Sequence, residues 1–169
     1  MLNNKLVLHI IRFFFLVLAQ VLVFNNLNFL GFINPMVYIL FFYWYPVKEN
    51  LSILLVVSFF LGLTIDFFSD TMAIHTAACL TIAYLRSGIM RFCFGVNYDF
   101  QNFKMTSTTT LQQVTFLALL ILFHHLIFFS LEIFSFNNLL LILKKVLIVG
   151  SASLLLCLLI KSLFSIQKK

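Results

Sequence analysis

The chain has 169 residues, of which 63% are hydrophobic and only 9% are charged, whereas a water-soluble domain carries about 25% charged residues. This composition excludes an ordinary soluble domain and predicts that lipid is the solvent for most of the chain. The net charge of +6 does not indicate nucleic-acid binding, because the Lys and Arg residues lie at the ends of apolar runs and form no patch.

Apolar runs follow one another along the chain, and a transmembrane helix needs about 20 such residues. We therefore predict an all-α integral membrane protein of one domain, residues 1–169, with about six transmembrane helices in one bundle. The first run starts like a signal peptide, but it continues through Phe24 and we expect an uncleaved span. Residues 91–113 are expected to form a loop on the inner face, and the predicted spans are 6–24, 33–45, 51–68, 71–90, 114–133 and 146–164.

The second run, PMVYILFFYWYP, is shorter than the hydrocarbon core demands. Two interpretations stay open, namely a short span that locally thins the bilayer and a re-entrant segment. We expect a true span with Tyr43, Trp44 and Tyr45 as an aromatic anchor at the membrane interface. A re-entrant segment would reverse the direction of every later span.

The positive charges predict the orientation. With six spans and a cytoplasmic N-terminus, most of the cations lie at the inner side, and only Lys144 and Lys145 lie outside. This asymmetry follows the positive-inside rule and predicts that both termini are cytoplasmic. The inner set is Lys5, Lys48, Arg86, Arg91, Lys104, Lys161, Lys168 and Lys169.

Two of the five acidic residues lie four apart in the stretch GLTIDFFSDT, at the predicted outer end of the third span. We expect Asp70 or Ser69 to start the fourth helix as its N-cap, because these side chains accept backbone N–H groups there. Asp66 lies one turn deeper, where a carboxylate must face the bundle interior, pair or be protonated. Asp66 is therefore a candidate partner contact, and a shallow interfacial carboxylate is the alternative.

His75 follows early in the fourth span, near Asp70, where the two side chains are in reach of a His–Asp hydrogen bond. Asp66, Asp70 and His75 have the ligand types of a metal site but no spacing signature, so no metal and no cofactor are predicted. Small residues predict close packing of the third span on the fourth; they are Ser58, Gly62, Ala73, Ala77, Ala78 and Ala83.

In the fifth span His125 and Glu132 are seven residues apart, which places them on one helix face. We expect Glu132 near the outer boundary and His125 near the middle of the bilayer. Polar side chains inside a membrane are functional candidates by default. The alternative is that both bond to other spans and hold the bundle together. The adjacent pair His124–His125 is a poor metal site, because neighbours on a helix point in different directions.

The familiar enzymatic motifs are missing, so no catalytic activity is predicted. Three stretches resemble the bacterial rod shape-determining protein MreD family: residues 25–46, 61–91 and 124–136. The most specific part is the pattern Gly-Leu-x-x-Asp-x-x-Ser-Asp followed by the small-residue fourth span, and the start of the second span at Ile33-Asn34-Pro35 is also similar.

The resemblance implies a non-catalytic scaffold of the cell-elongation machinery in the bacterial inner membrane. It implies an MreC-like membrane-anchored partner and, through that partner, an actin-like cytoskeleton and peptidoglycan synthases. It also implies a fold similar to the substrate-binding subunits of energy-coupling factor transporters. The candidate contacts for the partner are Asp66, Asp70, His75, His125 and Glu132.

Two rival functions stay open. A small-molecule-binding subunit of a transporter would need a pocket with convergent polar and aromatic groups, and spans one, two and six offer few of these, which favours the scaffold. An intramembrane enzyme has no recognisable set of catalytic residues behind it.

Overall fold

The computed structural model describes residues 4–27, 33–47, 50–95, 98, 103–134 and 138–166. The regular secondary structure in these ranges is all helical, with no β-strand. Five of the helices are long and apolar enough to cross a membrane, as expected for a multi-pass membrane protein. The elements are α1 (Asn4–Leu22), η1 (Phe24–Asn26), η2 (Val37–Ile39), α2 (Leu40–Trp44), α3 (Leu51–Ser69), α4 (Ile74–Phe94), η4 (Met105–Ser107), α5 (Thr110–Ile133) and α6 (Leu139–Ile166).

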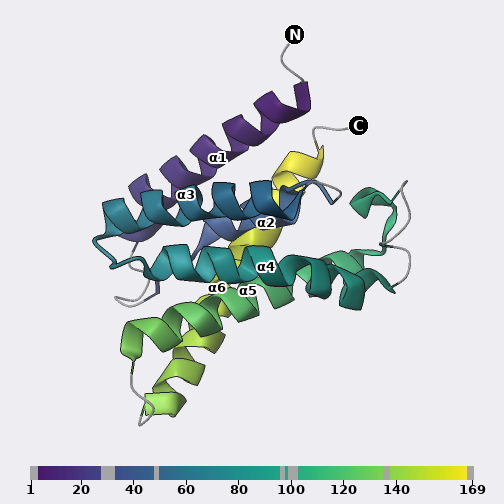
Figure 1. The fold of residues 1–169 in the computed structure, drawn as a ribbon. Coiled ribbons are helices and arrows are strands. Elements are labelled where there is room, and N and C mark those ends of the chain that lie inside the picture. The colour runs from purple at the N-terminus through teal and green to yellow at the C-terminus, as the bar shows by residue number, and fades with distance from the viewer. Residues whose placement is uncertain are drawn as a thin grey trace.

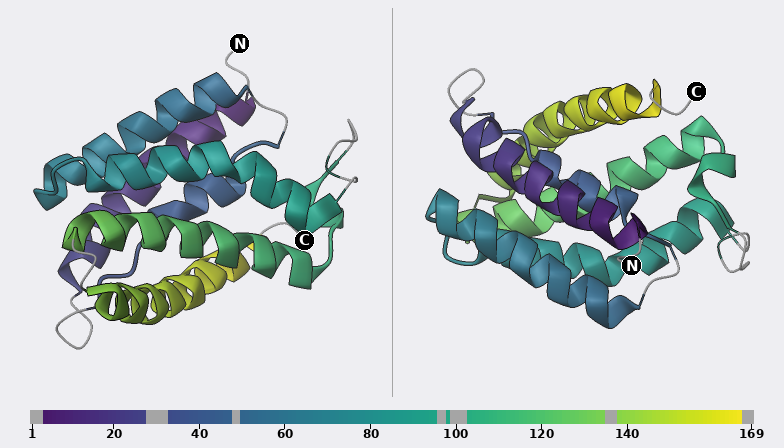
Figure 2. Two further views of the ribbon diagram at one scale, coloured as in Figure 1. Left: turned by 60° about the horizontal axis from the view of Figure 1, so that its bottom comes forward. Right: turned by 90° about the horizontal axis from the view of Figure 1, so that it is seen from above.

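The chain runs back and forth through one bundle, and its described part begins and ends at the same end (Figure 1). The helices α1, α3 and α5 run away from that end, and α4 and α6 run back toward it (Figures 1 and 2). Residues 33–47, which we call the second crossing, also run back toward it. We call the end at which the described chain begins and ends the terminal end and the opposite one the distal end.

The helix boundaries differ from the predicted spans at several places. Helix α4 continues to Phe94 and α5 begins at Thr110, so the predicted loop at 91–113 is shorter than expected. Gly95, with φ of +62°, ends α4, and a capping box between Thr109 and Gln112 starts α5. Helix α6 begins at Leu139, seven residues before its predicted start.

The second crossing differs from the expected second span in its secondary structure. It contains no helix of spanning length, because η2 and α2 together cover only residues 37–44. Eight helical residues advance about 12 to 14 Å, whereas extended residues advance about 3.3 Å each. The non-helical residues on either side therefore supply the rest of the path, and the segment still passes from the distal to the terminal end.

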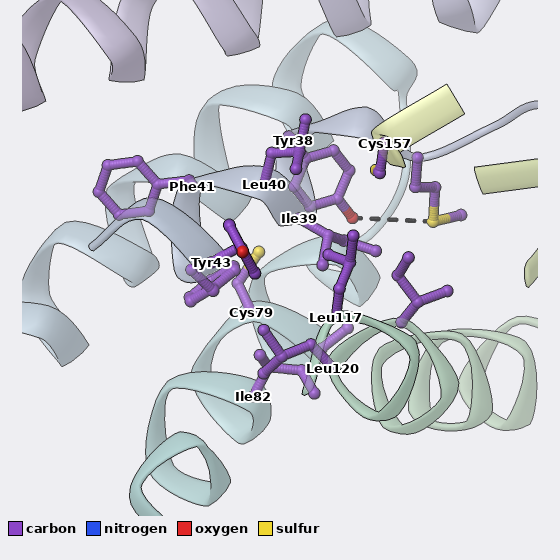
Figure 3. Packing of buried hydrophobic residues seen from close by; sticks show 14 of the residues in the cluster. Tyr38, Ile39, Leu40, Phe41, Tyr43, Cys79, Ile82, Leu117, Leu120 and Cys157 are labelled. Atoms are coloured by element: carbon purple, nitrogen blue, oxygen red, sulfur yellow. Dashed lines mark hydrogen bonds between the residues drawn. The ribbon is translucent and has the colours of Figure 1, made fainter. Parts of the chain in front are cut away.

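The second crossing forms the centre of the core. Five of its residues are fully buried: Val37, Tyr38, Ile39, Leu40 and Phe42. Figure 3 shows its side chains packed against Cys79 and Ile82 of α4, Leu117 and Leu120 of α5, and Cys157 of α6. Irregular backbone at membrane depth is tolerated where protein surrounds it, which explains why this apolar run needs no lipid contact of its own.

The expected aromatic anchor is also corrected. Tyr43 and Tyr45 are buried, and the Tyr43 hydroxyl donates a hydrogen bond to Gln113 Oε1 at 3.2 Å. Trp44 is partly buried, with the Arg12 guanidinium 5.3 Å from its ring centroid. These rings are therefore packed inside the protein, and Arg12 has an aromatic partner at the first span.

The outer surface of the long helices is apolar. Leu18 of α1, Phe60 of α3 and Leu155 of α6 are each more than half exposed. Large apolar residues cover long helices in this way when lipid surrounds them, since such patches are rare on soluble proteins.

The predicted close packing of α3 on α4 centres on Gly62. A Cβ atom at this position would lie 2.4 Å from Thr76 Cα and 2.7 Å from Thr76 N. Ser58, Ala78 and Ala83 are fully buried in the same region. Small side chains allow two membrane helices to approach this closely, and only glycine fits at the closest point.

We expect Gly62→Ala to destabilise the protein by about 3 kcal/mol, because the new methyl group meets backbone atoms that cannot move aside. The matched control is Gly88→Ala in α4, where nothing lies within 4 Å of the added Cβ; this change should be neutral or stabilise by up to about 1 kcal/mol. Unfolding of the purified protein in mixed micelles, followed by circular dichroism, measures both. Equal stability of the two variants would contradict this packing.

Candidate functional site

The carboxylate of Asp66 closes the distal end of the α3–α4 hairpin. Its Oδ1 accepts the Thr71 hydroxyl at 2.6 Å and the His75 backbone N–H at 2.9 Å, and lies 3.0 Å from His75 Nδ1. Its Oδ2 accepts the Thr76 backbone N–H at 2.8 Å and the Thr76 hydroxyl at 2.6 Å. We call these four residues, Asp66, Thr71, His75 and Thr76, the Asp66 clasp.

The clasp explains how a carboxylate is accommodated at this depth. The first backbone N–H groups of a helix have no partner within the helix, and the Asp66 oxygens accept two of them at the start of α4. The side chain is only 4% exposed. Asp66 thus faces the interior, as one of the expected alternatives requires, and its bonds go to its own hairpin.

The expected N-cap role of Asp70 or Ser69 is wrong. The N-cap position of α4 is occupied by Ala73, which makes no side-chain cap bond, and the capping oxygens come from Asp66. Asp70 instead ends α3 in the left-handed conformation, with φ of 53° and its N–H bonded to the Asp66 carbonyl. Aspartate tolerates this conformation better than most residues, and Asp70 is exposed.

His75 bonds to Asp66, whereas the sequence placed it near Asp70. Its Nδ1 lies within hydrogen-bond distance of both Asp66 Oδ1 and the Thr71 hydroxyl, and its ring lies 4.6 Å from that of Phe128 in α5. Among the described residues, no group of three or more His, Cys, Asp or Glu side chains is placed to hold a metal ion.

His125 connects three segments in the middle of the bundle. The Met36 N–H donates to Ser153 Oγ at 2.9 Å, and Ser153 Oγ lies 3.2 Å from His125 Nε2. His125 Nδ1 donates to the Ile121 carbonyl at 2.9 Å, so in the neutral ring Nε2 accepts the Ser153 hydroxyl. This fully buried residue therefore holds α5, α6 and the second crossing together, which favours the structural alternative for His125.

Glu132 lies in a different setting from His125. It is exposed at the distal end of α5, and Lys145 Nζ of α6 donates to its Oε2 at 2.8 Å. Lys145, which opposed the charge asymmetry in the sequence, thus has a partner on the neighbouring helix. The ammonium also lies 5.3 Å from the centre of the Phe129 ring.

Two polar side chains hold the second crossing in place through hydrogen bonds to its backbone. Neither of them was proposed as a site residue from the sequence. Gln20 of α1 is 1% exposed and bonds both Pro35 and Val37, through Nε2 to the Pro35 carbonyl at 3.0 Å and through Oε1 from the Val37 N–H at 2.8 Å. A lone amide within an apolar run is itself a signal, because polar groups in a membrane need partners.

Arg86 also bonds the backbone of the second crossing, at the opposite end from Gln20. The sequence assigned it to the inner boundary, but it is 4% exposed. It donates to the carbonyls of Phe42 at 2.7 Å, Tyr45 at 2.5 Å and Pro46 at 3.4 Å. These carbonyls belong to the last turn of α2 and to the two residues that follow it, where the helix itself supplies no N–H donors. The planar guanidinium fork is suited to several acceptors at once.

The distal end also holds a polar cavity of about 620 Å³, partly open to the outside. We call it the distal cavity. Its lining comes from α1, the second crossing and the ends of α3 to α6. The polar residues of the lining include Gln20, Asn25, Asn34, His75, Glu132 and Lys145. The sequence suggested few such groups on the first, second and sixth spans, but all three contribute here.

Comparisons with protein-family models, with curated proteins and with solved structures find no match to this chain.

We expect Asp66→Asn to destabilise the protein by about 3 kcal/mol, because an amide presents a donor to N–H groups that need an acceptor. Asp70→Asn is the matched control, since asparagine also tolerates the left-handed conformation, and it should change stability by less than about 0.5 kcal/mol. Resistance to unfolding in mixed micelles reports the difference. A destabilising Asp70→Asn beside a neutral Asp66→Asn would refute the clasp.

Arg86→Met should destabilise the protein by about 3 kcal/mol or more, because it leaves buried carbonyl groups without donors. Arg86→Lys should restore little, since a single ammonium does not reproduce the planar fork. The control is Lys144→Met, which removes an exposed cation from α6. Limited proteolysis near residues 45–47 offers a second measurement, because loss of the Arg86 bonds frees this segment first. Equal protection in the two Met variants would count against the assignment.

Proposed function

We propose that this chain is a non-catalytic scaffold of the bacterial cell-elongation machinery, located in the inner membrane with both termini in the cytoplasm. It maintains cell shape by binding an MreC-like membrane-anchored partner, and through that partner it connects to an actin-like cytoskeleton and to peptidoglycan synthases. The sequence resemblance to the MreD family supplies these partners. The placement of both ends of the described chain on one side of the bundle is compatible with the orientation.

The use of the buried polar side chains supports a scaffold more than an enzyme. Asp66, Gln20 and Arg86 make their hydrogen bonds to backbone groups or side chains of this same chain. Side chains held in this way make a rigid bundle, because a buried network whose members are all bonded favours one arrangement. The pattern Gly-Leu-x-x-Asp-x-x-Ser-Asp, on which the resemblance depends, thus has a structural role in the α3–α4 hairpin.

The exposure of the five candidate residues reduces the set that can form polar contacts with the partner. Asp66, His75 and His125 are at most 5% exposed, whereas Asp70 and Glu132 are exposed at the distal end. We therefore assign a polar contact with an extracytoplasmic segment of the partner to Asp70 and Glu132, and an internal role to the three buried residues.

A groove between α1 and α6 offers a place for the partner's transmembrane helix. It has a volume of about 400 Å³, is almost entirely apolar, and is lined by residues that include Phe15, Ala19 and Leu163, with Val37 of the second crossing. The two helices diverge toward the terminal end (Figure 2). The floor of the groove is Val37, which is fully buried in the core, so a partner helix seated there would pack directly on the second crossing.

Site-specific photocrosslinking in cells tests the proposal. A benzophenone amino acid in place of Phe15, which lines the groove, should capture the MreC-like protein of the same cell. The same amino acid in place of Phe60 on α3 should not, although the two side chains are 51% and 54% exposed. Depletion of the protein should also convert rod-shaped cells to spheres. Unchanged shape on depletion, with no capture of the partner at Phe15, would refute the scaffold.

A second candidate is a small-molecule-binding subunit of a transporter, and the distal cavity is the observation that favours it. Its polar groups converge from several elements and lie beside the aromatic rings of Phe128 and Phe129, as expected for a ligand site. The proposed similarity to energy-coupling factor substrate-binding subunits would accommodate this function. A ligand that is retained through purification and identified by mass spectrometry, with rod shape unaffected by depletion, would select it over the scaffold.

A further inference from the structure

Two cations toward the terminal end of the bundle have no acidic partner among the described residues. Arg12 of α1 and Lys161 of α6 are both partly buried. Lys161 Nζ donates to the uncharged Gln113 at 2.9 Å and lies 5.1 Å from the centre of the Tyr43 ring. The carboxylates that the structure describes all lie at the distal end; they are Asp66, Asp70 and Glu132. The described part of the chain therefore leaves positive charge unbalanced at the terminal end.

Arg12 has the fewest bonds of its own. Its guanidinium lies 5.3 Å from the centroid of the Trp44 ring, and this cation–π contact provides no hydrogen-bond acceptor. No described residue accepts a hydrogen bond from the five N–H donors of Arg12. Charged side chains within a membrane-spanning segment normally pair with an opposite charge or with carbonyl groups. The donors of Arg12 are thus available to an acceptor from outside the chain.

Arg12 also points toward one surface of the membrane. It lies eight residues after Asn4, which is about 12 Å along α1 from the described start of the helix. Helical side chains tilt toward the N-terminus of their helix, and for α1 this is the terminal end. A long cationic side chain with this tilt carries its charge toward the lipid headgroups. The guanidinium is therefore in reach of phosphates in the leaflet at the terminal end.

The apolar groove between α1 and α6 extends from Arg12 toward the distal end. Phe15 and Ala19, which line it, follow Arg12 by three and seven residues and so share its face of α1. Phe164 lines the groove from α6, and its ring lies 6.1 Å from that of Phe15 and 5.6 Å from that of Trp44. The two helices diverge toward this end, which opens the groove there (Figure 2). Arg12 thus lies at the open mouth of an apolar groove.

We propose that this groove holds one anionic phospholipid, with its phosphate on Arg12 and one acyl chain along the groove. The planar guanidinium fork suits phosphate oxygens, and basic pockets between membrane helices bind anionic headgroups. Lys161, beside the groove residue Ile160 on α6, adds a second positive charge. The proposal goes beyond the scaffold role and does not depend on it. The lipid fills the groove of the protein by itself, and a partner helix that enters the groove would displace the acyl chain.

The first experiment compares two lipids that differ in headgroup charge. The full chain is purified in detergent micelles and titrated with dioleoyl phosphatidylglycerol or dioleoyl phosphatidylcholine, and native mass spectrometry measures the bound lipid. Because each cation near a headgroup contributes about 1 kcal/mol, we expect one phosphatidylglycerol molecule to bind at least about tenfold more tightly. Equal affinity for the two lipids would overturn the proposal, since it would indicate only the lipid that surrounds any membrane protein.

A pair of variants locates the phosphate. Arg12→Gln should weaken phosphatidylglycerol binding about fivefold or more. Lys144→Gln is the matched control, because it removes an exposed cation from α6 toward the distal end, and it should leave the affinity unchanged. Equal losses in the two variants would overturn the assignment, since they would reflect the net charge of the protein alone.

Ala19→Trp tests the groove separately from the charge. The larger side chain fills the groove from α1 and leaves Arg12 in place, so phosphatidylglycerol binding should again fall about fivefold or more. This variant decides the question should Arg12→Gln not fold, and circular dichroism verifies the helical content of each protein. Unchanged affinity in folded Ala19→Trp would overturn the proposal.

A soluble competitor distinguishes the lipid from a free anion. Glycerol 1-phosphate has the phosphate and glycerol of the headgroup but no acyl chain, and at millimolar concentration it should not displace phosphatidylglycerol. Displacement would overturn the proposal, because the groove would then contribute nothing. Photocrosslinking of the partner at Phe15 in cells remains an independent readout of the scaffold.

Discussion

The structure depends on one constraint: backbone hydrogen-bonding groups at membrane depth need partners. Five long helices satisfy it internally, but the second crossing does not, because part of it is not helical. Its free groups are paired by side chains from three helices, namely Gln20 of α1, Arg86 of α4 and Ser153 of α6. The bundle is therefore organised around a segment that has no place in lipid by itself.

The same constraint explains the location of the acidic residue that first suggested a function. Asp66 supplies acceptors where the first turn of α4 has free donors, and Gly62 lets α3 approach closely enough for these bonds. The hairpin and the second crossing are thus stabilised in the same way. In each, a polar side chain of one element bonds the free backbone groups of another, as water would at the surface of a soluble protein. The distal cavity differs, because there polar side chains of several elements surround an open space.

Much of the fold was predictable from the sequence, because long apolar runs and small residues act locally. The runs indicated about six spans, of which five are helices of spanning length among the described residues, and the small residues around Gly62 indicated the close hairpin. The second crossing was recognised as too short, but its burial was not predictable, since it depends on the side chains of three distant helices. The boundaries of the turn between α3 and α4 were not predicted. Asp70 at the end of α3 and Ala73 at the start of α4 both adopt the left-handed conformation, and neither is a glycine that would have indicated it.

The candidate site was predictable in composition more than in arrangement. Asp66, His75 and Glu132 were identified as polar residues in apolar surroundings, and each has a partner in the structure. Arg86 was assigned to the membrane boundary because a cation near the end of a run usually lies there. The distal cavity draws on six elements, and no single segment contains enough of it to reveal it.

The partners of the second crossing have a consequence for biosynthesis. Gln20 precedes this segment along the chain, but Arg86 and Ser153 follow it, and Ser153 lies 117 residues beyond Met36. A nascent chain therefore contains residues 33–47 long before the ribosome has made the side chains that hold them. The interior closes only when α6 has been made, so the helices that precede it lie in the bilayer with this segment incompletely paired until then.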